Sequence, residues 1–155
     1  MLVSEMSRGE CEDLLARVGY GCLGCARKDQ PYVVPIYFAA APGLLYGFAT
    51  VGQKIEWMRL NPLVCLEAHE VLNDTEWASV VVQGRYEEFP DTPQYAEERR
   101  ETQSQLEKAR LLWWKTGLSA AQARWRFDRD RTVFYCIHVE EISGRRASHD
   151  PVERK

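Results

Sequence analysis

The sequence predicts a mainly β protein, an antiparallel barrel with helices packed around it. Three observations support this prediction. Five short segments with strand character follow an N-terminal helix, a sixth lies near the C-terminus, and tight turns join most neighbouring strands. Segments with the periodicity of helices lie among them. The 155 residues, 45% of them apolar, suffice for a sizeable core, so we expect a single domain over residues 1–155.

The first predicted elements are a helix and a hairpin. Ser7 and Glu10 have the spacing of a capping box, and apolar residues recur at helical spacing as far as Val18. The segments from Tyr20 to Arg27 and from Tyr32 to Ala41 have strand character, and a polar turn joins them. We therefore expect a helix followed by two antiparallel strands.

The middle of the chain contains three more predicted strands and one short helix. A strand from Leu44 to Ala49 precedes a helix from Gln53 to Leu60, which Asn61-Pro62 ends. Two strands follow, from Leu63 to Glu70 and from Trp77 to Phe89. Apolar and polar residues alternate along the second of them, which is typical of a strand with one buried face.

The C-terminal part is predicted to contain a long helix and the last strand. Helical periodicity runs from about Thr92 to Thr116, and a shorter helix is expected from Ser119 to Phe127. The last strand is expected from Thr132 to Ile142. The residues from about 144 onward are polar, which predicts a loose tail.

Composition and charge argue against several classes of function. The formal net charge is −3 and basic residues are interleaved with acidic ones, so we expect no nucleic-acid partner. Neither a secretory signal nor an apolar stretch long enough to cross a bilayer is evident, so no membrane association is expected. Five scattered cysteines are typical of free thiols in a reducing compartment, which predicts a cytoplasmic protein.

Some patterns resemble functional motifs but are interpreted structurally. Residues 19–24 match G-x-G-x-x-G, yet a helix precedes them and a strand follows, the reverse of the order that a dinucleotide site needs. Cys22 and Cys25 form a C-x-x-C pair whose thiols should point to opposite faces of a strand. The three histidines have no evident second ligand, so no metal site is predicted. They are His69, His138 and His149.

The most informative stretch joins the third strand to the helix that follows it. The strand ends near Thr50, the chain passes through Gly52, and Gln53 and Lys54 occupy the first turn of the helix. Free backbone N–H groups, the positive end of the helix dipole, a hydroxyl and an ammonium would converge there, which predicts a phosphate site. The alternative is that Thr50 and Gln53 form a capping box and that Lys54 is simply solvated.

Six segments in a fixed order extend this interpretation. They are PYVVPIY (31–37), LYGFAT (45–50), GQKI (52–55), LNPLVC (60–65), WASVVVQGR (77–85) and FYCI (134–137). In this order and spacing the chain resembles the pyridoxamine 5′-phosphate oxidase-like FMN-binding split barrels, nearest the nitroimidazole-resistance (Nim-type) flavoproteins. The resemblance covers about residues 7–146. It implies a six-stranded antiparallel split β-barrel with Greek-key topology and peripheral helices, forming a homodimer with two FMN molecules at the interface.

The resemblance also implies a set of cofactor contacts. Residues 35–37 would present their backbone to the flavin ring, residues 48–50 would run along the ribityl chain, and the loop into the helix would hold the phosphate. Two residues of the strand from Trp77 to Phe89 would reach in from the partner subunit. The implied cofactor-binding residues are Pro35, Ile36, Tyr37, Phe48, Ala49, Thr50, Gln53, Lys54, Trp77 and Ser79.

The function implied by the resemblance is that of an FMN-dependent oxidoreductase. A reduced nicotinamide nucleotide or another donor would reduce FMN, and the flavin would pass electrons to a small aromatic or nitroaromatic acceptor. Residues 143–149 do not reproduce the Arg-x-His motif of the pyridoxamine-phosphate oxidases proper, so vitamin B6 oxidation is not expected. Some Nim-type proteins have a histidine where this chain has Phe48 or Thr50, so chemistry that needs it is not expected, and no side chain is predicted as acid or base.

Three alternatives stay open at this stage. The first is a haem-binding module with His69 or His138 as axial ligand, since related split barrels accommodate haem. The second is a carrier or sensor that binds FMN without turnover. The third is a reductase that depends on the deazaflavin F420, whose phosphate would use similar donors.

Overall fold

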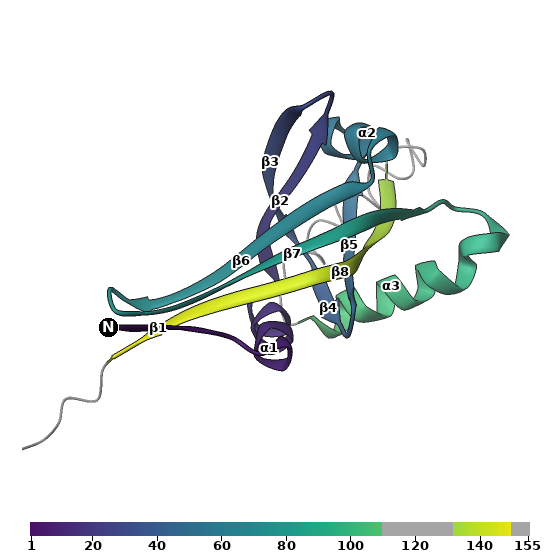
Figure 1. Ribbon diagram of the computed structural model, residues 1–155. Helices are drawn as coiled ribbons and strands as arrows, with labels where there is room; N and C mark the ends of the chain where they lie inside the picture. Colours follow the sequence, from purple (N-terminus) through teal and green to yellow (C-terminus); the bar gives the residue numbers. More distant parts are fainter. Residues whose placement is uncertain (110–131, 150–155) are drawn as a thin grey trace, which may run out of the picture.

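The computed structural model describes residues 1–109 and 132–149, which form one sheet with helices around it (Figure 1). The strands are β1 (Leu2–Glu5), β2 (Tyr20–Arg27), β3 (Gln30–Tyr37), β4 (Ala39–Ala41), β5 (Leu44–Thr50), β6 (Leu63–Asn73), β7 (Glu76–Phe89) and β8 (Thr132–Ser148). The helices are α1 (Arg8–Val18), α2 (Gln53–Leu60) and α3 (Ala96–Lys108), with a 3-10 turn η1 (Pro93–Tyr95) before α3.

The sheet is antiparallel and does not close. Its strand order within the described residues is β3-β2-β6-β7-β8-β5-β4, and β1 pairs with the end of β8. Because β3 and β4 stand at the two ends of this order and do not pair, the barrel is split between them. This confirms the predicted fold class, mainly antiparallel β with peripheral helices.

The six predicted strands are all present, and two short strands are added. The chain leaves β3 at the buried residue Phe38, whose N–H donates to Gly19 O at 3.0 Å, so the predicted strand from Tyr32 to Ala41 is divided into β3 and β4. β1 was not predicted. It has the four residues Leu2–Glu5, and its partner in the ladder is more than 130 residues away, at residues 145–148.

The predicted loose tail is wrong for residues 144–148, and residues 150–155 lie outside the described residues. β8 continues to Ser148 and pairs there with both β1 and β7, for example Arg146 with Ser4 on one side and with Ala78 on the other. Backbone hydrogen bonds from two neighbouring strands hold a segment whose polar composition suggests a coil. The predicted long helix corresponds to α3, which ends at Lys108. The part of that prediction beyond residue 109 and the predicted helix Ser119–Phe127 lie outside the described residues.

Helices α1 and α2 cover the main core on one side of the sheet. Ser7 caps α1 as predicted: its Oγ accepts from Glu10 N–H at 3.3 Å, and the Glu10 carboxylate accepts from Ser7 N–H at 2.8 Å. Leu14 of α1 and Ile55 and Met58 of α2 are fully buried in this core. None of the helices in residues 1–109 and 132–149 has the length and apolar character that crossing a bilayer requires.

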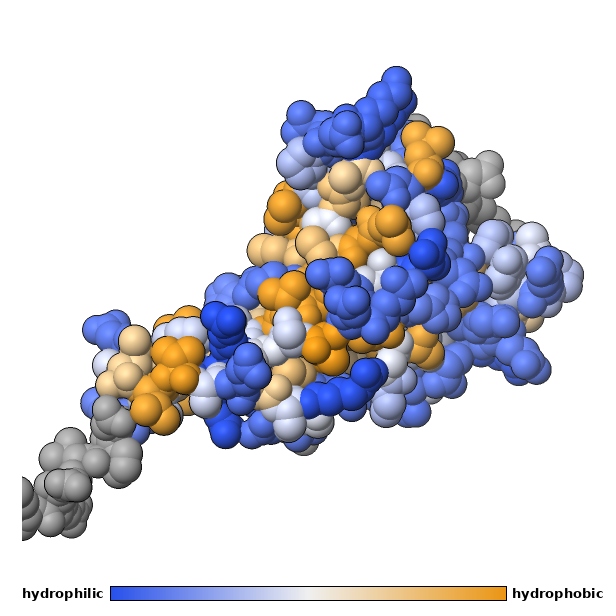
Figure 2. Space-filling view, in the orientation of Figure 1, coloured by the Kyte–Doolittle hydropathy of each residue, from blue (hydrophilic) through white to orange (hydrophobic). Residues whose placement is uncertain are grey.

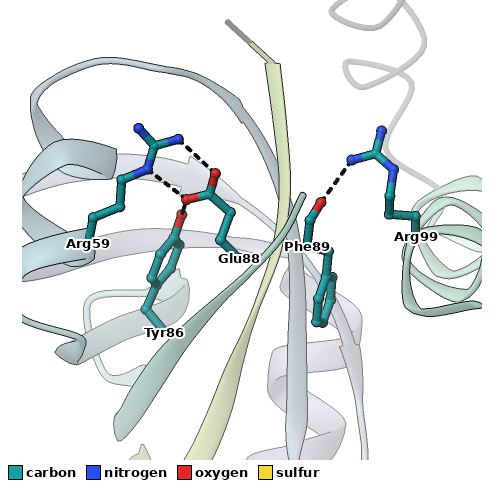
Figure 3. Close-up of polar contacts among 5 residues, drawn as sticks. All are labelled: Arg59, Tyr86, Glu88, Phe89 and Arg99. Atoms are coloured by element: carbon teal, nitrogen blue, oxygen red, sulfur yellow. Dashed lines mark hydrogen bonds and ion pairs between the residues drawn. The ribbon is translucent and has the colours of Figure 1, made fainter. Parts of the chain in front are cut away.

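Helix α3 covers a second, smaller cluster on the opposite face. Leu106 packs there with side chains of β5 and β8 that alternate with core residues along each strand, among them Phe134 and Cys136. Arg99 holds α3 in place, because its Nη1 donates to Phe89 O at 2.8 Å (Figure 3). Its guanidinium also lies 4.9 Å from the centre of the Phe134 ring.

No described element covers the remainder of this outer face, over β2, β3, β6 and β7. Large apolar side chains are exposed there at alternating strand positions. They are Tyr20 (42% exposed), Val33 (63%), Tyr37 (41%), Leu63 (53%) and Val81 (41%). Figure 2 shows hydrophobic side chains on the surface of the sheet and at the projecting tip of the β6–β7 hairpin, where Val71 and Leu72 are exposed. We refer to this part of the sheet as the uncovered face.

Candidate functional site

The predicted phosphate loop forms the N-terminus of α2. β5 ends at Thr50, and Gly52 is the N-cap of α2 with an extended backbone (φ −163°, ψ −168°). No side chain accepts a hydrogen bond at this cap, so the alternative capping box between Thr50 and Gln53 is not formed. The first N–H groups of α2 therefore have no partner within the helix and lie at the positive end of its dipole, which is the arrangement that binds anions.

Lys54 supplies the positive charge at this helix end. Its side chain is half-buried, and no carboxylate among residues 1–109 and 132–149 pairs with it. Burial lowers the pKa of the Lys54 ammonium, and the neighbouring Cys25 thiol partly offsets this effect. An ammonium that has lost part of its hydration and has no counter-ion favours binding of an anion, which would replace the lost solvation.

The backbone at Gly52 leaves room for a ligand. Among the described residues, a Cβ at this position would meet no atom closer than Thr50 O, at 4.0 Å. The extended φ of Gly52 is open to any residue, so neither strain nor crowding within the described chain requires glycine here. Close approach of a ligand to the backbone is a common reason for glycine at such a position. The residues present thus fit a phosphate group.

Three polar side chains fix α2 on the sheet (Figure 3). Arg59, in the last turn of α2, donates from Nε and Nη2 to the two carboxylate oxygens of Glu88 on β7, at 2.8 and 2.7 Å. Tyr86 donates its hydroxyl to the same carboxylate at 2.9 Å. The bond from Arg59 lowers the pKa of Glu88, while burial raises the pKa of Tyr86. Because the ion pair is bidentate, it sets the orientation of α2 as well as its position.

The predicted residues of β3 lie at an edge of the sheet. Within the described residues β3 pairs only with β2 and stands at one end of the strand order. Pro35 and Tyr37 are exposed on the uncovered face, whereas Ile36 is 6% exposed and belongs to the core. Any contact of Ile36 with a cofactor must therefore use the backbone, as the resemblance implies.

The predicted residues of β5 lead to the N-terminus of α2. Ala49 is 7% exposed and its side chain is part of the core, so only its backbone can face a ligand. Phe48 is half-buried, with its ring centre 5.4 Å from that of Phe134. Thr50 is exposed at the end of the strand, next to the exposed Gln53. The structure thus brings Thr50, Gln53 and Lys54 to one helix end.

Trp77 and Ser79 do not join this group within one chain. Both lie near the start of β7. The end of β7 that lies near α2 is marked by Arg85, because β6 follows α2 and its first residue pairs with Arg85. Ser79 and Arg85 are six positions apart, which corresponds to about 20 Å along the strand. Ser79 instead lines a groove of about 460 Å³ together with Val81 and Arg145 on the outer side of the sheet. Their assignment to the site of a partner subunit stays a prediction.

A larger hollow of the surface lies away from the predicted residues. A groove of about 490 Å³ between α1, β4 and α3 is lined by polar side chains that include Arg17 and Lys108, and by none of the ten predicted residues. Arg17 is already paired with Glu70, at 2.7 Å between Nη2 and Oε2. We therefore regard the helix end at Lys54, whose ammonium pairs with no described carboxylate, as the better candidate.

Two histidines for which the sequence shows no evident partner do have partners in the structure. His69 Nδ1 lies 2.9 Å from Glu67 Oε1, and His138 Nε2 lies 2.6 Å from Glu87 Oε2 and 3.4 Å from the Cys136 thiol. All five cysteines are free, as predicted. The cluster of Glu87, Cys136 and His138 was missed, because only the C-x-H spacing of its last two members is visible in the sequence.

Comparison with known proteins gives a consistent result. Residues 7–146 match the sequence model of the pyridoxamine 5′-phosphate oxidase family. An uncharacterized protein of Rhizobium meliloti is 41% identical over 155 residues, covering 95% of this chain and 97% of the relative. The crystal structure of an FAD-binding protein of Mesorhizobium loti is 38% identical with a TM-score of 0.73, covering 96% of this chain and 99% of the other. A Bacteroides thetaiotaomicron protein assigned to 5-nitroimidazole antibiotic resistance shares the fold alone, at 18% identity, a TM-score of 0.64 and coverages of 96% and 93%.

Proposed function

Because the chain belongs to the pyridoxamine 5′-phosphate oxidase family, we propose that it binds a flavin nucleotide and acts as an oxidoreductase. The observation that carries this proposal is the N-terminus of α2, where an uncapped helix end, open space beside Gly52 and the half-buried Lys54 lie together. A flavin nucleotide offers the phosphate that such a site would bind. The M. loti relative, which is an FAD-binding protein, supports a flavin as the ligand.

The residues of this chain would bind and orient the cofactor. Lys54 and the first N–H groups of α2 would hold the phosphate, and Phe48 and Thr50 would flank the ribityl chain. Pro35 and Tyr37 of β3 would lie beside the ring. The flavin itself, when bound, supplies the transfer of hydride and electrons. We propose NADH or NADPH as the donor and a small aromatic or nitroaromatic compound as the acceptor, the class that the Nim-type resemblance implies.

Two flavin nucleotides fit the proposed phosphate site. The sequence predicts FMN, whereas the relative from M. loti is FAD-binding. Both molecules carry a phosphate on the ribityl chain, so the end of α2 would serve either, and FAD would need further space for its adenosine half. Flavin released from the purified protein by heat and identified by chromatography decides between them.

We also propose a homodimer in which the second copy completes the site. Tyr20, Val33 and Val81 expose apolar side chains on the uncovered face, and such side chains are stabilised when a partner covers them. Trp77 and Ser79 are residues of β7 as well, which supports their contact with a cofactor held mainly by the other copy.

The dimer is tested by a charge placed on the uncovered face. Val81→Glu should give a monomer by light scattering and weaken flavin binding, because a carboxylate would be buried without a partner. Val81→Thr is the matched control, since it keeps the shape of the side chain and adds no charge. A Val81→Glu protein that remains a dimer would place the interface elsewhere.

The flavin site is tested by Lys54. In the full-length protein, Lys54→Ala should weaken flavin binding by about 1–3 kcal/mol, or roughly 5- to 150-fold, measured by quenching of flavin fluorescence. Lys54→Arg should retain most of the affinity because it keeps the charge. Lys108→Ala removes an exposed lysine at the end of α3 and should leave binding unchanged. Equal affinity in Lys54→Ala and wild type would reject the site.

The visible spectrum of the purified protein separates the remaining possibilities. A flavin spectrum that is bleached by NADH or NADPH supports the oxidoreductase. A flavin spectrum that neither donor changes would instead indicate a carrier or sensor. A Soret band without a flavin signal would favour the haem-binding alternative, and F420 would be recognised by its own absorption.

A further inference from the structure

Three side chains with potential metal ligands converge on the outer side of β7 and β8, two residues along β8 from Phe134, whose ring contacts that of Phe48. His138 Nε2 lies 2.6 Å from Glu87 Oε2 and 3.4 Å from Cys136 Sγ. All three donor atoms lie within 4.8 Å of one another. None of these residues is among those proposed to bind the flavin.

The register of the sheet creates this convergence. Glu87 of β7 lies directly opposite Cys136 of β8, so their side chains are neighbours on the same face. His138 follows Cys136 by two residues and therefore points to that face as well. A register shift between Gln83 and Gly84 precedes this part of the ladder and sets these pairs.

The geometry is that of a ligand set and differs from that of a proton relay. In a relay the imidazole uses its two nitrogens for two different partners. Here the carboxylate and the thiol approach the same nitrogen, His138 Nε2, and all three donor atoms lie within 4.8 Å of one another. A simple ion pair between Glu87 and His138 would explain the shorter contact but would not require the thiol.

The separation of sulfur and nitrogen also suits a small tetrahedral ion. With metal–sulfur and metal–nitrogen bonds of about 2.3 and 2.05 Å, a tetrahedral site places sulfur about 3.6 Å from nitrogen. The observed separation of Sγ and Nε2 is 3.4 Å. The carboxylate would have to withdraw from Nε2 by roughly 0.7 Å to reach its tetrahedral separation. The Glu87 side chain is 44% exposed, so this movement is open to it.

We propose that Glu87, Cys136 and His138 bind a divalent transition metal, with Zn²⁺ the ion that this mixture of oxygen, sulfur and nitrogen ligands suits best. Three protein ligands leave one tetrahedral position for water. The buried thiol is reached through Glu87 and His138, whose side chains are 44% and 48% exposed. On binding, the S–H bond breaks, a metal–sulfur bond forms, and the proton passes to solvent, with no change of oxidation state.

The chain contains its own control for this proposal. Cys65, Glu67 and His69 have the same three residue types, spaced two apart on β6. His69 and Glu67 are in contact, at 2.9 Å. Cys65 lies four residues from His69, or about 13 Å along a strand, so the three donors cannot share one ion.

The test is a Co²⁺ titration of the full-length protein after removal of metal with a chelator. We expect one Co²⁺ per chain, with thiolate-to-cobalt charge transfer in the near ultraviolet and the strong visible bands of tetrahedral cobalt, and displacement by Zn²⁺. Cys136→Ser should abolish the charge-transfer band. Since changes outside the ligand shell already cost about 10- to 100-fold in metal affinity, His138→Gln should cost about 100-fold or more.

The controls separate this site from adventitious binding and from the flavin site. Cys65→Ser and His69→Gln should bind Co²⁺ as the wild type does, and so should Lys54→Ala, which tests the flavin site independently. His138 is exposed, so His138→Gln should fold even if Cys136→Ser does not, and circular dichroism checks both. A charge-transfer band that survives in Cys136→Ser, or unchanged affinity in a folded His138→Gln protein, would overturn the proposal.

Discussion

The carboxylate of Glu88 is the acceptor on which the attachment of α2 depends, so its removal tests the structure directly. Glu88→Ala deletes the acceptor of three hydrogen bonds, two from Arg59 and one from Tyr86. We expect this single change to loosen the helix that presents Lys54, and to lower the free energy of unfolding.

The size of the loss in unfolding free energy depends on how well water can hydrate Tyr86 and Arg59 once the carboxylate is gone. Tyr86 is 7% exposed, so its hydroxyl loses its acceptor where water has little access, at a cost of about 1–3 kcal/mol. The Arg59 side chain is 44% exposed and can be hydrated again, so loss of the ion pair adds only about 0.5–1 kcal/mol. We therefore expect Glu88→Ala to destabilise the protein by about 1.5–4 kcal/mol.

A double-mutant cycle separates the two contributions. Urea unfolding followed by tryptophan fluorescence, without flavin and at one protein concentration, gives the free energies. In a Tyr86→Phe background no hydroxyl is left without an acceptor, so Glu88→Ala should cost only about 1 kcal/mol there. The reasoning is refuted if Glu88→Ala lies within about 0.5 kcal/mol of the wild type, or if it costs the same in both backgrounds.

Three further predictions follow from burial and charge. Because Arg59 lowers the pKa of Glu88 below its ordinary 4.5, the stabilisation is present above that pH and is lost as the pH falls through the lowered value; urea unfolding at a series of pH values should show wild type and Glu88→Ala converging in acid. Gly47→Ala should lower the free energy of unfolding by about 1–3 kcal/mol, because the added Cβ would collide with the buried Tyr135 ring. Gly9→Ala, in helix α1, should raise it by about 0.4–1 kcal/mol, because the added Cβ meets no described atom within 4 Å. Thermal unfolding measures both effects. The buried hydroxyl of Tyr135 has no partner among the described residues, so Tyr135→Phe should leave the free energy of unfolding unchanged or raise it, in contrast to Tyr86→Phe.

The elements that the sequence predicted well are those whose signals are local. The capping box of Ser7 and Glu10 starts α1, and Asn61-Pro62 follows the last residue of α2, as expected. The hairpin of β2 and β3 was recognised from its polar turn. By contrast, β1 and the end of β8 were missed, because four residues at one end of the chain are ordered only by pairing with the other end.

Of the two candidate sites, one is made of residues close in the sequence and the other of residues far apart. Thr50, Gln53 and Lys54 are close in the sequence, so a strand followed by a helix brings them together whatever the surrounding fold does. Whether Thr50 caps the helix was left open by the spacing, and the N-cap at Gly52 decided it. Glu87 and His138 are 51 residues apart, and no local pattern links them.

The sequence by itself therefore determined the class of fold and the bounds of most strands and helices, and it predicted a phosphate site made of near neighbours. Strand and helix periodicity and turn chemistry act over a few residues, and they are legible without knowledge of the fold. Only the tertiary structure decided which strands pair, which face the described helices leave uncovered, and that Glu87, Cys136 and His138 lie together. Those outcomes depend on the register of β7 against β8 and on one shift in it, and a displacement of a single residue would send the side chains to opposite faces.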